Sequence, residues 1–239
     1  MRTELKSRLK KVLELLPPSD VVYDIGCDHG YLSAALILSG RAKRVVASDI
    51  SPASVEKARA LSVELGIEDR MLCLSADGLE PVQNAAGDYS IAVCGMGGEL
   101  ILRLIESSRK AAEGASLIVM QPMRGEAELR RYLFENGFGI TDECVAFDDG
   151  RYYQITAARH GLDNSIPEGF PKDWFRFGWV MANKRDENLL KLLYHYRSVY
   201  KRELEKARRS FKDPEPLRLE IERTEALIDF IGGSENQCF

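Results

Sequence analysis

Residues 21–32 read VVYDIGCDHGYL, and this stretch decides the fold. An apolar run ends at Asp24, and Gly26 and Gly30 follow it. Such a run is typical of a strand buried on both faces of a parallel sheet, and the glycines are typical of a loop that lets a ligand approach the backbone. One position is unusual, because the carboxylate of Asp28 stands where a nucleotide-binding loop has a glycine.

The loop departs from the dinucleotide fingerprint Gly-x-Gly-x-x-Gly. Counted from Gly26, the second and third glycine positions hold Asp28 and Tyr31. A carboxylate there repels a pyrophosphate, so hydride transfer with NAD is disfavoured. The methyltransferase loop Asp/Glu-x-Gly-x-Gly-x-Gly fits better, with Asp28 in place of its middle glycine. Its ligand, S-adenosylmethionine, has no phosphate and tolerates a carboxylate near its ammonium and its cationic sulfur.

The segments around this loop predict an α/β fold. An amphipathic helix stopped by Pro17 and Pro18 comes first, and apolar strands then alternate with helices. The predicted strands are 21–25, 44–49, 71–77, 89–95 and 116–122. Residues 138–159 hold two further strand-like runs joined by Asp149–Gly150, a strong hairpin signal. The pattern predicts a Rossmann-like class I methyltransferase sheet, parallel with a terminal antiparallel hairpin strand.

The C-terminal part is helical and charged. Residues 161–171 read as a linker between a domain at 1–160 and a helical domain at 172–239. Apolar side chains recur every three or four residues from Leu189 to Phe211 and again from Leu217 to Ile231, on either side of KDPEP (212–216). Two such helices joined by a proline-containing turn predict an antiparallel coiled coil.

Composition limits the classes of function. The 239 residues carry a formal net charge of −4, but residues 172–223 hold 14 Lys and Arg against nine acidic residues. A basic helical arm on an acidic domain favours an RNA partner. The longest apolar runs are far shorter than the roughly 20 residues that span a bilayer, which predicts no membrane partner. The five cysteines form no CxxC pair, which predicts reduced thiols, no metal site and a cytoplasmic location.

Further candidate residues stand at the ends of the later strands. Asp49 can accept bonds from ribose hydroxyls, and Asp77 can accept one from an adenine amino group, with Gly78 leaving room for the ring. Each acid could instead be a helix cap or a turn residue. The bare backbone at 95–98 favours a planar ligand, although a tight turn into a helix is the alternative. The amide of Gln121 can read a base edge, or belong to an ordinary proline-containing loop.

Together these stretches resemble one family. DIGCDHGYL, ASDIS, GMGGELI, QPMRGEAELRRYL and DDGRYYQI follow the order and character of the bacterial tRNA (adenine-22-N1)-methyltransferases. The resemblance covers nearly the whole chain and implies methyl transfer from S-adenosylmethionine to adenine N1 in the D-arm region of tRNA. It implies a cofactor set of Asp24, Gly26, Cys27, Asp49, Ile50, Asp77, Gly78, Gly95 and Met96. It implies catalytic roles for Asp28, His29 and Tyr31. The substrate set is Gly97, Gly98, Gln121, Pro122, Arg197, Lys201 and Arg208.

Several roles stay open at this point. Adenine N1 needs no deprotonation before it attacks, so an ionised Asp28 could stabilise the developing charge or accept an amino proton; alternatively it binds the methionine ammonium. His29 could titrate near neutrality or only bond the backbone. Tyr31 could stack on the flipped base or begin a helix in the core. The alternative activity is methyl transfer to another RNA or to a small molecule.

The basic residues of the helical arm are candidates for phosphate contacts, and the alternative is a solvated face with ion pairs. The candidates are Lys191, Arg197, Lys201, Arg202, Lys206, Arg208, Arg209 and Lys212. Lys6, Arg8, Lys10 and Lys11 either extend that surface or belong to a helix that covers the sheet. A monomer is favoured.

Overall fold

A computed structural model describes residues 5–168, 170, 175–209 and 213–232. Phe211, Lys212 and Cys238 lie outside the described residues. The chain divides into two compact units, Met1–Asn164 and Ser165–Phe239. The domain bounds 1–160 and 172–239 stay a prediction, and Phe170 contacts Trp179 and Phe230 within the second unit.

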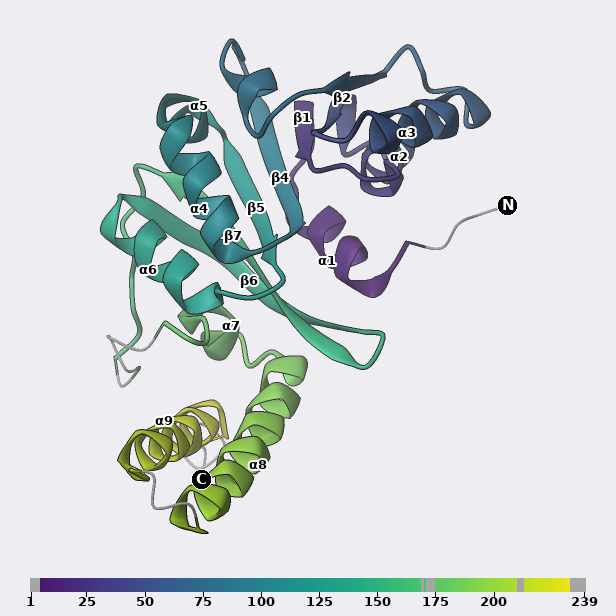
Figure 1. Cartoon of the computed structure of the whole chain (residues 1–239). Helices are drawn as coiled ribbons and strands as arrows, with labels where there is room; N and C mark the ends of the chain where they lie inside the picture. Colours follow the sequence, from purple (N-terminus) through teal and green to yellow (C-terminus); the bar gives the residue numbers. More distant parts are fainter. Residues whose placement is uncertain (1–4, 169, 171–174, 210–212, 233–239) are drawn as a thin grey trace, which may run out of the picture. The chain divides into compact units, whose positions relative to one another are not determined.

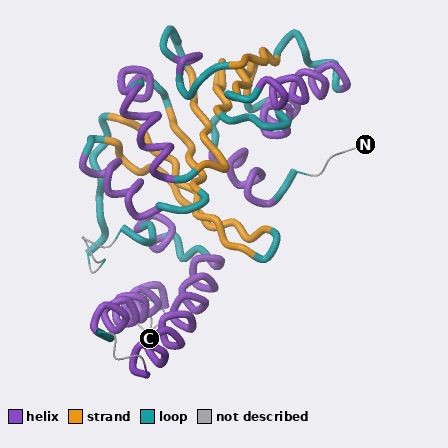
Figure 2. Tube along the Cα trace, in the orientation of Figure 1, coloured by secondary structure: helices purple, strands orange, loops and turns teal. Residues whose placement is uncertain are grey.

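The first unit is a seven-stranded sheet with helices on both faces (Figures 1 and 2). Its strands are β1 Ser19–Ile25, β2 Ala42–Asp49, β3 Met71–Ser75, β4 Tyr89–Met96, β5 Leu117–Pro122, β6 Phe138–Asp148 and β7 Arg151–His160. Its α-helices are α1 Ser7–Leu15, α2 Tyr31–Leu38, α3 Pro52–Glu64, α4 Gly98–Ser107, α5 Arg109–Gly114 and α6 Glu126–Glu135. A short 3-10 helix covers Glu80–Val82.

The strand order β3-β2-β1-β4-β5-β7-β6 confirms the predicted fold class. Strands β1 to β5 pair in parallel, whereas β7 runs antiparallel to both β5 and β6. The Asp149–Gly150 turn has positive φ at both residues, as a two-residue hairpin requires. Because β1 lies next to both β2 and β4, the chain reverses its direction of growth at β1, and ligands of open α/β sheets bind at such a point.

The second unit is helical. It contains α7 Trp179–Asn183, α8 Glu187–Arg209 and α9 Glu215–Gly232. Helices α8 and α9 pack on each other through Tyr200, Leu204 and Ile221, which confirms the predicted helical pair. Whether the pair supercoils stays a prediction. Helices α5 and α7 were not predicted, because six and five residues are too few to show a helical period.

Among the described residues no helix is long and apolar enough to cross a membrane. Nor do those residues contain a cluster of His, Cys, Asp and Glu side chains suited to hold a metal ion.

Candidate functional site

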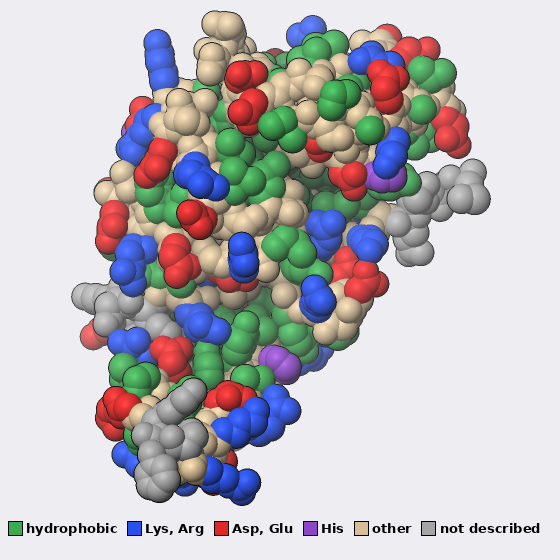
Figure 3. Space-filling model, viewed as in Figure 1, with side chains coloured by type: hydrophobic (Ala, Val, Ile, Leu, Met, Phe, Trp, Pro, Cys, Tyr) green, Lys and Arg blue, Asp and Glu red, His purple; other side chains and the backbone are tan. Residues whose placement is uncertain are grey.

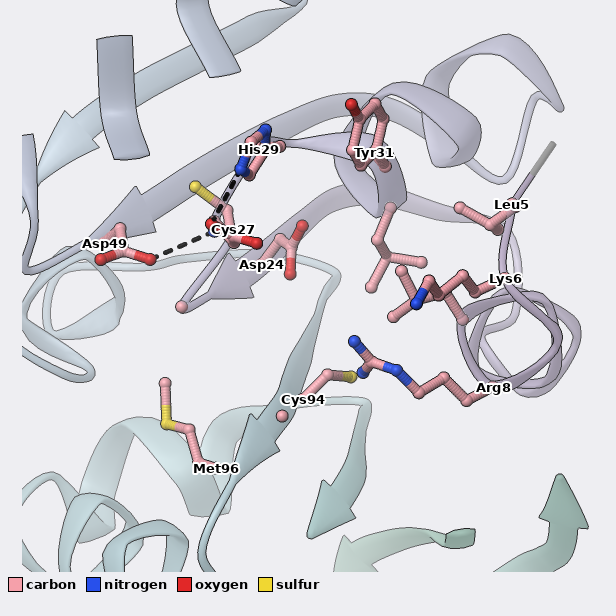
Figure 4. A pocket seen from close by; sticks show the side chains of 15 residues that line it. Leu5, Lys6, Arg8, Asp24, Cys27, His29, Tyr31, Asp49, Cys94 and Met96 are labelled. Atoms are coloured by element: carbon pink, nitrogen blue, oxygen red, sulfur yellow. Dashed lines mark hydrogen bonds and ion pairs between the residues drawn. The ribbon is translucent and has the colours of Figure 1, made fainter. Parts of the chain in front are cut away.

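A cavity of about 670 Å³ opens at the carboxyl ends of β1, β2 and β4 (Figure 4). This size lies within the range of small-molecule sites. Nine of the predicted site residues line it: Asp24, Gly26, Cys27, Asp28, His29, Tyr31, Asp49, Gly95 and Met96. The other predicted site residues of the first unit, which do not line it, are Ile50, Asp77, Gly78, Gly97, Gly98, Gln121 and Pro122.

The loop after β1 is held by backbone bonds to β2. The amides of Gly26 and Cys27 both donate to the carbonyl of Ser48, at 2.8 and 2.9 Å. Gly26 has φ +73°, a backbone conformation that favours glycine, and a Cβ at this position would displace the flexible end of the Met96 side chain. The backbone conformation is therefore the main reason for glycine at this point.

Asp28 also has a left-handed backbone, with φ 49°. Aspartate and asparagine are enriched among the residues that adopt this conformation, so the carboxylate here does not require a distorted loop. The side chain is 73 % exposed and lies 3.5 Å from Nε2 of His29. The aspartate at the middle glycine position thus keeps the turn of the loop and adds a negative charge at the rim of the cavity.

Asp49 links the first two loops. Its Oδ2 accepts from the Asp28 amide at 3.1 Å, and its Oδ1 accepts from the Ser51 amide at 2.9 Å. A carboxylate has about four lone-pair sites, so acceptor capacity remains for a ligand hydroxyl. The turn role and the ribose role that the sequence left as alternatives are therefore compatible in one residue.

Asp24 is a buried acid at the floor of the cavity. Its Oδ2 accepts from the Ser33 hydroxyl at 2.6 Å, and the side chain is only 2 % exposed. Burial raises the pKa of Asp24 to about 6, and the bond from Ser33 offsets only part of this effect. Among the described residues no cation lies within ion-pair distance of this carboxylate, so a bound cation would stabilise its charged form.

His29 and Tyr31 lie together at the rim. Their rings stack with centroids 5.7 Å apart and planes 11° from parallel. Tyr31 begins α2 and is still 41 % exposed, so the alternative of a core residue is disfavoured. The pair offers a flat aromatic surface beside the cavity.

Asp77 and Gly78 follow β3, whose last residue Ser75 pairs with Asp49 of β2. They therefore belong to the same edge of the sheet as the cavity, and Asp77 is exposed there with its amide bonded to Glu80. Their role toward an adenine ring stays a prediction.

The glycines at the end of β4 and just after it serve different purposes. Gly95 has φ +76° and lines the cavity. Gly97 precedes α4 as its N-cap. Gly98 is buried against the loop at 124–125, and a Cβ there would collide with the carbonyl oxygen of Gly125. Packing against the loop at 124–125 is sufficient to require glycine at position 98. A contact between Gly98 and the substrate stays a prediction.

Gln121 is fully buried rather than exposed to a ligand. Its Oε1 accepts from Arg8 at 2.8 Å, and its Nε2 donates to the carbonyl of Pro122 at 2.8 Å. The amide therefore fixes a side chain of α1 in this structure. A direct contact with a base edge, as the sequence predicted, would require Arg8 to leave.

Helix α1 supplies the wall that the sequence did not assign. That side of the cavity is formed by the start of α1 and the two residues before it, with Leu5, Lys6, Arg8 and Leu9 as lining residues. Leu32 and Cys94 are further lining residues outside the predicted set. Amphipathic spacing indicated a helix that packs on the sheet, but it did not indicate which strand ends the helix covers. Burial raises the pKa of the Cys94 thiol, so it remains protonated and unreactive.

Lys and Arg side chains gather along the visible flank of α8 (Figure 3). The basic residues that the sequence predicted as phosphate contacts differ in their interaction partners. Lys201 pairs with Glu225 and Arg208 with Glu205, both at 2.8 Å. The guanidinium of Arg197 lies 4.9 Å from the ring centroid of Tyr194. Three others have no carboxylate partner among the described residues: Lys191, Arg202 and Arg209.

Comparison with known proteins agrees with this geometry. Residues 5–156 match the family described as methyltransferase domain. The chain is 26 % identical to a tRNA (adenine(22)-N(1))-methyltransferase of Bacillus subtilis, over 95 % of this chain and 97 % of that one.

Two solved structures share the fold. The M. capricolum TrmK structure, in complex with the cofactor product S-adenosylhomocysteine, has a TM-score of 0.80 at 21 % identity, covering 95 % of this chain and 99 % of that one. The B. subtilis M1A22 tRNA methyltransferase TrmK has a TM-score of 0.73 at 22 % identity, covering 96 % and 98 %.

Proposed function

The chain belongs to the methyltransferase domain family, and from this premise we propose that it transfers a methyl group from S-adenosylmethionine to N1 of adenine 22 in bacterial tRNA. The observation that carries the proposal is the cavity at the carboxyl ends of β1, β2 and β4, with Asp24, Asp28 and Asp49 around it. The similarity to the B. subtilis enzyme, which extends over both units, supports the choice of substrate.

The residues present fit the cofactor. Asp24 is a buried carboxylate that no cation of the described residues meets, and the methionine half of the cofactor brings an ammonium. Asp49 keeps acceptor capacity for the ribose hydroxyls, and no pyrophosphate has to pass the carboxylate of Asp28. When bound, S-adenosylmethionine supplies an electrophilic methyl group on a sulfonium.

The protein has little covalent chemistry to perform. Adenine N1 attacks with an in-plane lone pair, so the main task of the site is to align the base. The stacked rings of His29 and Tyr31 offer a surface for a base that has left its stem, because a paired adenine hides N1. Asp28, 73 % exposed at the rim, then stabilises the positive charge of the methylated base or accepts its amino proton.

Asp28→Asn tests this role cleanly. Both residues tolerate the left-handed backbone at φ 49°, so the variant removes the charge and keeps the loop. We expect turnover to fall about 100-fold, as for loss of a general base or a charge-stabilising group. The affinity of Asp28→Asn for S-adenosylhomocysteine should be unchanged in isothermal titration. Weakened cofactor binding with normal turnover would instead assign Asp28 to the methionine ammonium.

Our candidates for phosphate contacts are the cations of α8 that meet no carboxylate in the described part of the chain. Lys191, Arg202 and Arg209 are separated by 11 and 7 residues, which are nearly whole numbers of helical turns, so they form one stripe about 27 Å long. Replacing all three with Gln should lower tRNA affinity at least tenfold and reduce the salt dependence of binding. The matched control replaces the three paired cations Lys201, Lys206 and Arg208 with Gln. Equal losses in both variants would refute the assignment.

The activity itself is tested by mass spectrometry of nucleosides from unmodified tRNA incubated with the protein and labelled S-adenosylmethionine. Labelled 1-methyladenosine is the expected product. Labelled N6-methyladenosine would keep the cofactor and reject the target atom. If the protein binds the cofactor but no tRNA nucleoside is labelled, the substrate is another RNA or a small molecule. We expect the enzyme to act as a cytoplasmic monomer.

A further inference from the structure

Helix α1 is capped by the β6–β7 hairpin rather than by its own sequence. The N-cap residue Lys6 makes no side-chain cap bond. The Arg8 amide instead donates to Oδ2 of Asp148 at 3.3 Å, and Nζ of Lys6 lies 2.7 Å from Oδ2 of Asp149. A carboxylate at a helix N-terminus is stabilising, because it meets unsatisfied amides and the positive end of the helix dipole. The hairpin turn therefore holds the first turn of α1 in place.

The Arg8 side chain extends from that turn into the cavity (Figure 4). Its Nη1 donates to Gln121, whose own orientation is fixed by the bond from Nε2 to the Pro122 carbonyl. The same Nη1 would lie 3.8 Å from a Cβ at Gly95, so the guanidinium lies beside the end of β4. Both ends of this residue, the backbone amide and the guanidinium, are thus held by the sheet.

Within the described part of the chain, the Arg8 guanidinium meets no anion. A guanidinium carries five N–H donors, and the described residues accept one hydrogen bond from it, through the neutral amide of Gln121. Arg8 is half-buried, and a cation withdrawn from water in this way is favourable only when an anion meets it. Lys6 lines the same cavity but is more exposed, and its charge already faces Asp149.

We propose that Arg8 binds the carboxylate of the methionine half of the cofactor, with Gln121 as its positioning residue. This inference rests on the proposed function, because it assumes that S-adenosylmethionine occupies the cavity. That ligand is a zwitterion at its amino-acid end, and the cavity offers both signs of charge: Asp24 for the ammonium and Arg8 for the carboxylate. A tRNA phosphate is the competing anion, but the direction of Arg8 into the cavity and its bond to a buried amide favour the small ligand.

The test compares ligands that differ only at this end. Isothermal titration measures binding of S-adenosylhomocysteine and of 5′-methylthioadenosine, which lacks the amino acid, to the full-length protein and to Arg8→Met. Loss of a charge-assisted bond should weaken S-adenosylhomocysteine about 10- to 100-fold and change 5′-methylthioadenosine less than twofold. Lys10→Met, which removes an exposed cation of the same helix that does not line the cavity, is the matched control, with no selective effect expected. Circular dichroism checks that each variant is folded.

A second measurement needs no variant. Decarboxylated S-adenosylmethionine keeps the ammonium and lacks the carboxylate, so the unaltered protein should bind it at least tenfold more weakly than S-adenosylmethionine. In Arg8→Met this preference should vanish.

Other results would overturn the proposal. If Arg8→Met weakens binding of S-adenosylhomocysteine and of 5′-methylthioadenosine equally, Arg8 only supports the cavity wall. If the variant keeps its cofactor affinity but binds tRNA more weakly, Arg8 contacts a phosphate. Equal binding of S-adenosylmethionine and decarboxylated S-adenosylmethionine by the unaltered protein would also refute the proposal. A protein that binds no cofactor at all refutes the proposed function itself, which distinguishes the two failures.

Discussion

Asp24→Asn should make the protein more stable while it weakens the cofactor site. In the folded chain the Asp24 carboxyl is almost completely enclosed, and its pKa is raised from an ordinary 3.8 to about 6. A shift of about two pKa units corresponds to about 3 kcal/mol. This is the free energy by which the ionised carboxylate disfavours folding at neutral pH.

The direction of the pH dependence follows from proton binding. Between pH 3.8 and about 6 the folded protein holds a proton that the unfolded chain has released, so this residue makes the protein less stable as pH rises through that window. Asparagine keeps the shape and can still accept the bond from Ser33, and its new N–H groups face the cavity. Asp24→Asn should therefore gain up to about 3 kcal/mol at pH 8 and almost nothing at pH 4.

Urea denaturation followed by far-UV circular dichroism, at pH 8 and at pH 4, measures the difference in unfolding free energy. Hydrogen exchange of the β1 amides assigns the change to the first unit. Titration with S-adenosylhomocysteine should show weaker binding in the same variant, because the ammonium loses its counterion. A variant that is no more stable at pH 8, or whose gain in stability is the same at both pH values, would refute the reasoning.

Two further perturbations test the framework of the site. Arg130 and Glu143 form a fully buried ion pair at 2.6 Å. Arg130→Met should therefore cost about 3–5 kcal/mol of unfolding free energy in urea, because the buried Glu143 carboxylate loses its cation, while Met at the exposed neighbour Arg131 changes little. A loss under 1 kcal/mol would show that the carboxylate is neutralised in another way. Gly26→Ala and Gly40→Ala both place alanine at positive φ, at a cost of about 1–2 kcal/mol, but only at Gly26 does the new Cβ meet a side chain. Only Gly26→Ala should weaken binding of S-adenosylhomocysteine in titration, because its Cβ displaces the Met96 side chain that lines the cavity, and equal binding by both variants would contradict this argument.

The cofactor loop shows how much of the site is local. Asp24, Gly26 and Asp28 stand within five consecutive residues, and the strand before them fixes which edge of the sheet they reach. Asp49 follows the same rule at the next strand. Parallel strands place all their carboxyl ends at one edge, so alternating strands and helices were sufficient to bring these residues together.

The sequence by itself determined the strands, the hairpin and the loop acids, because apolar runs, helical periods and an Asp-Gly turn are patterns among neighbouring residues. Only the tertiary structure decided that Arg8 meets Gln121 across 113 positions, and that Asp148 caps a helix 140 positions away. A basic residue on an amphipathic helix has the same local pattern whether it faces solvent or a cavity. Its partner depends on which strand ends the helix covers, and packing of the whole sheet determines that.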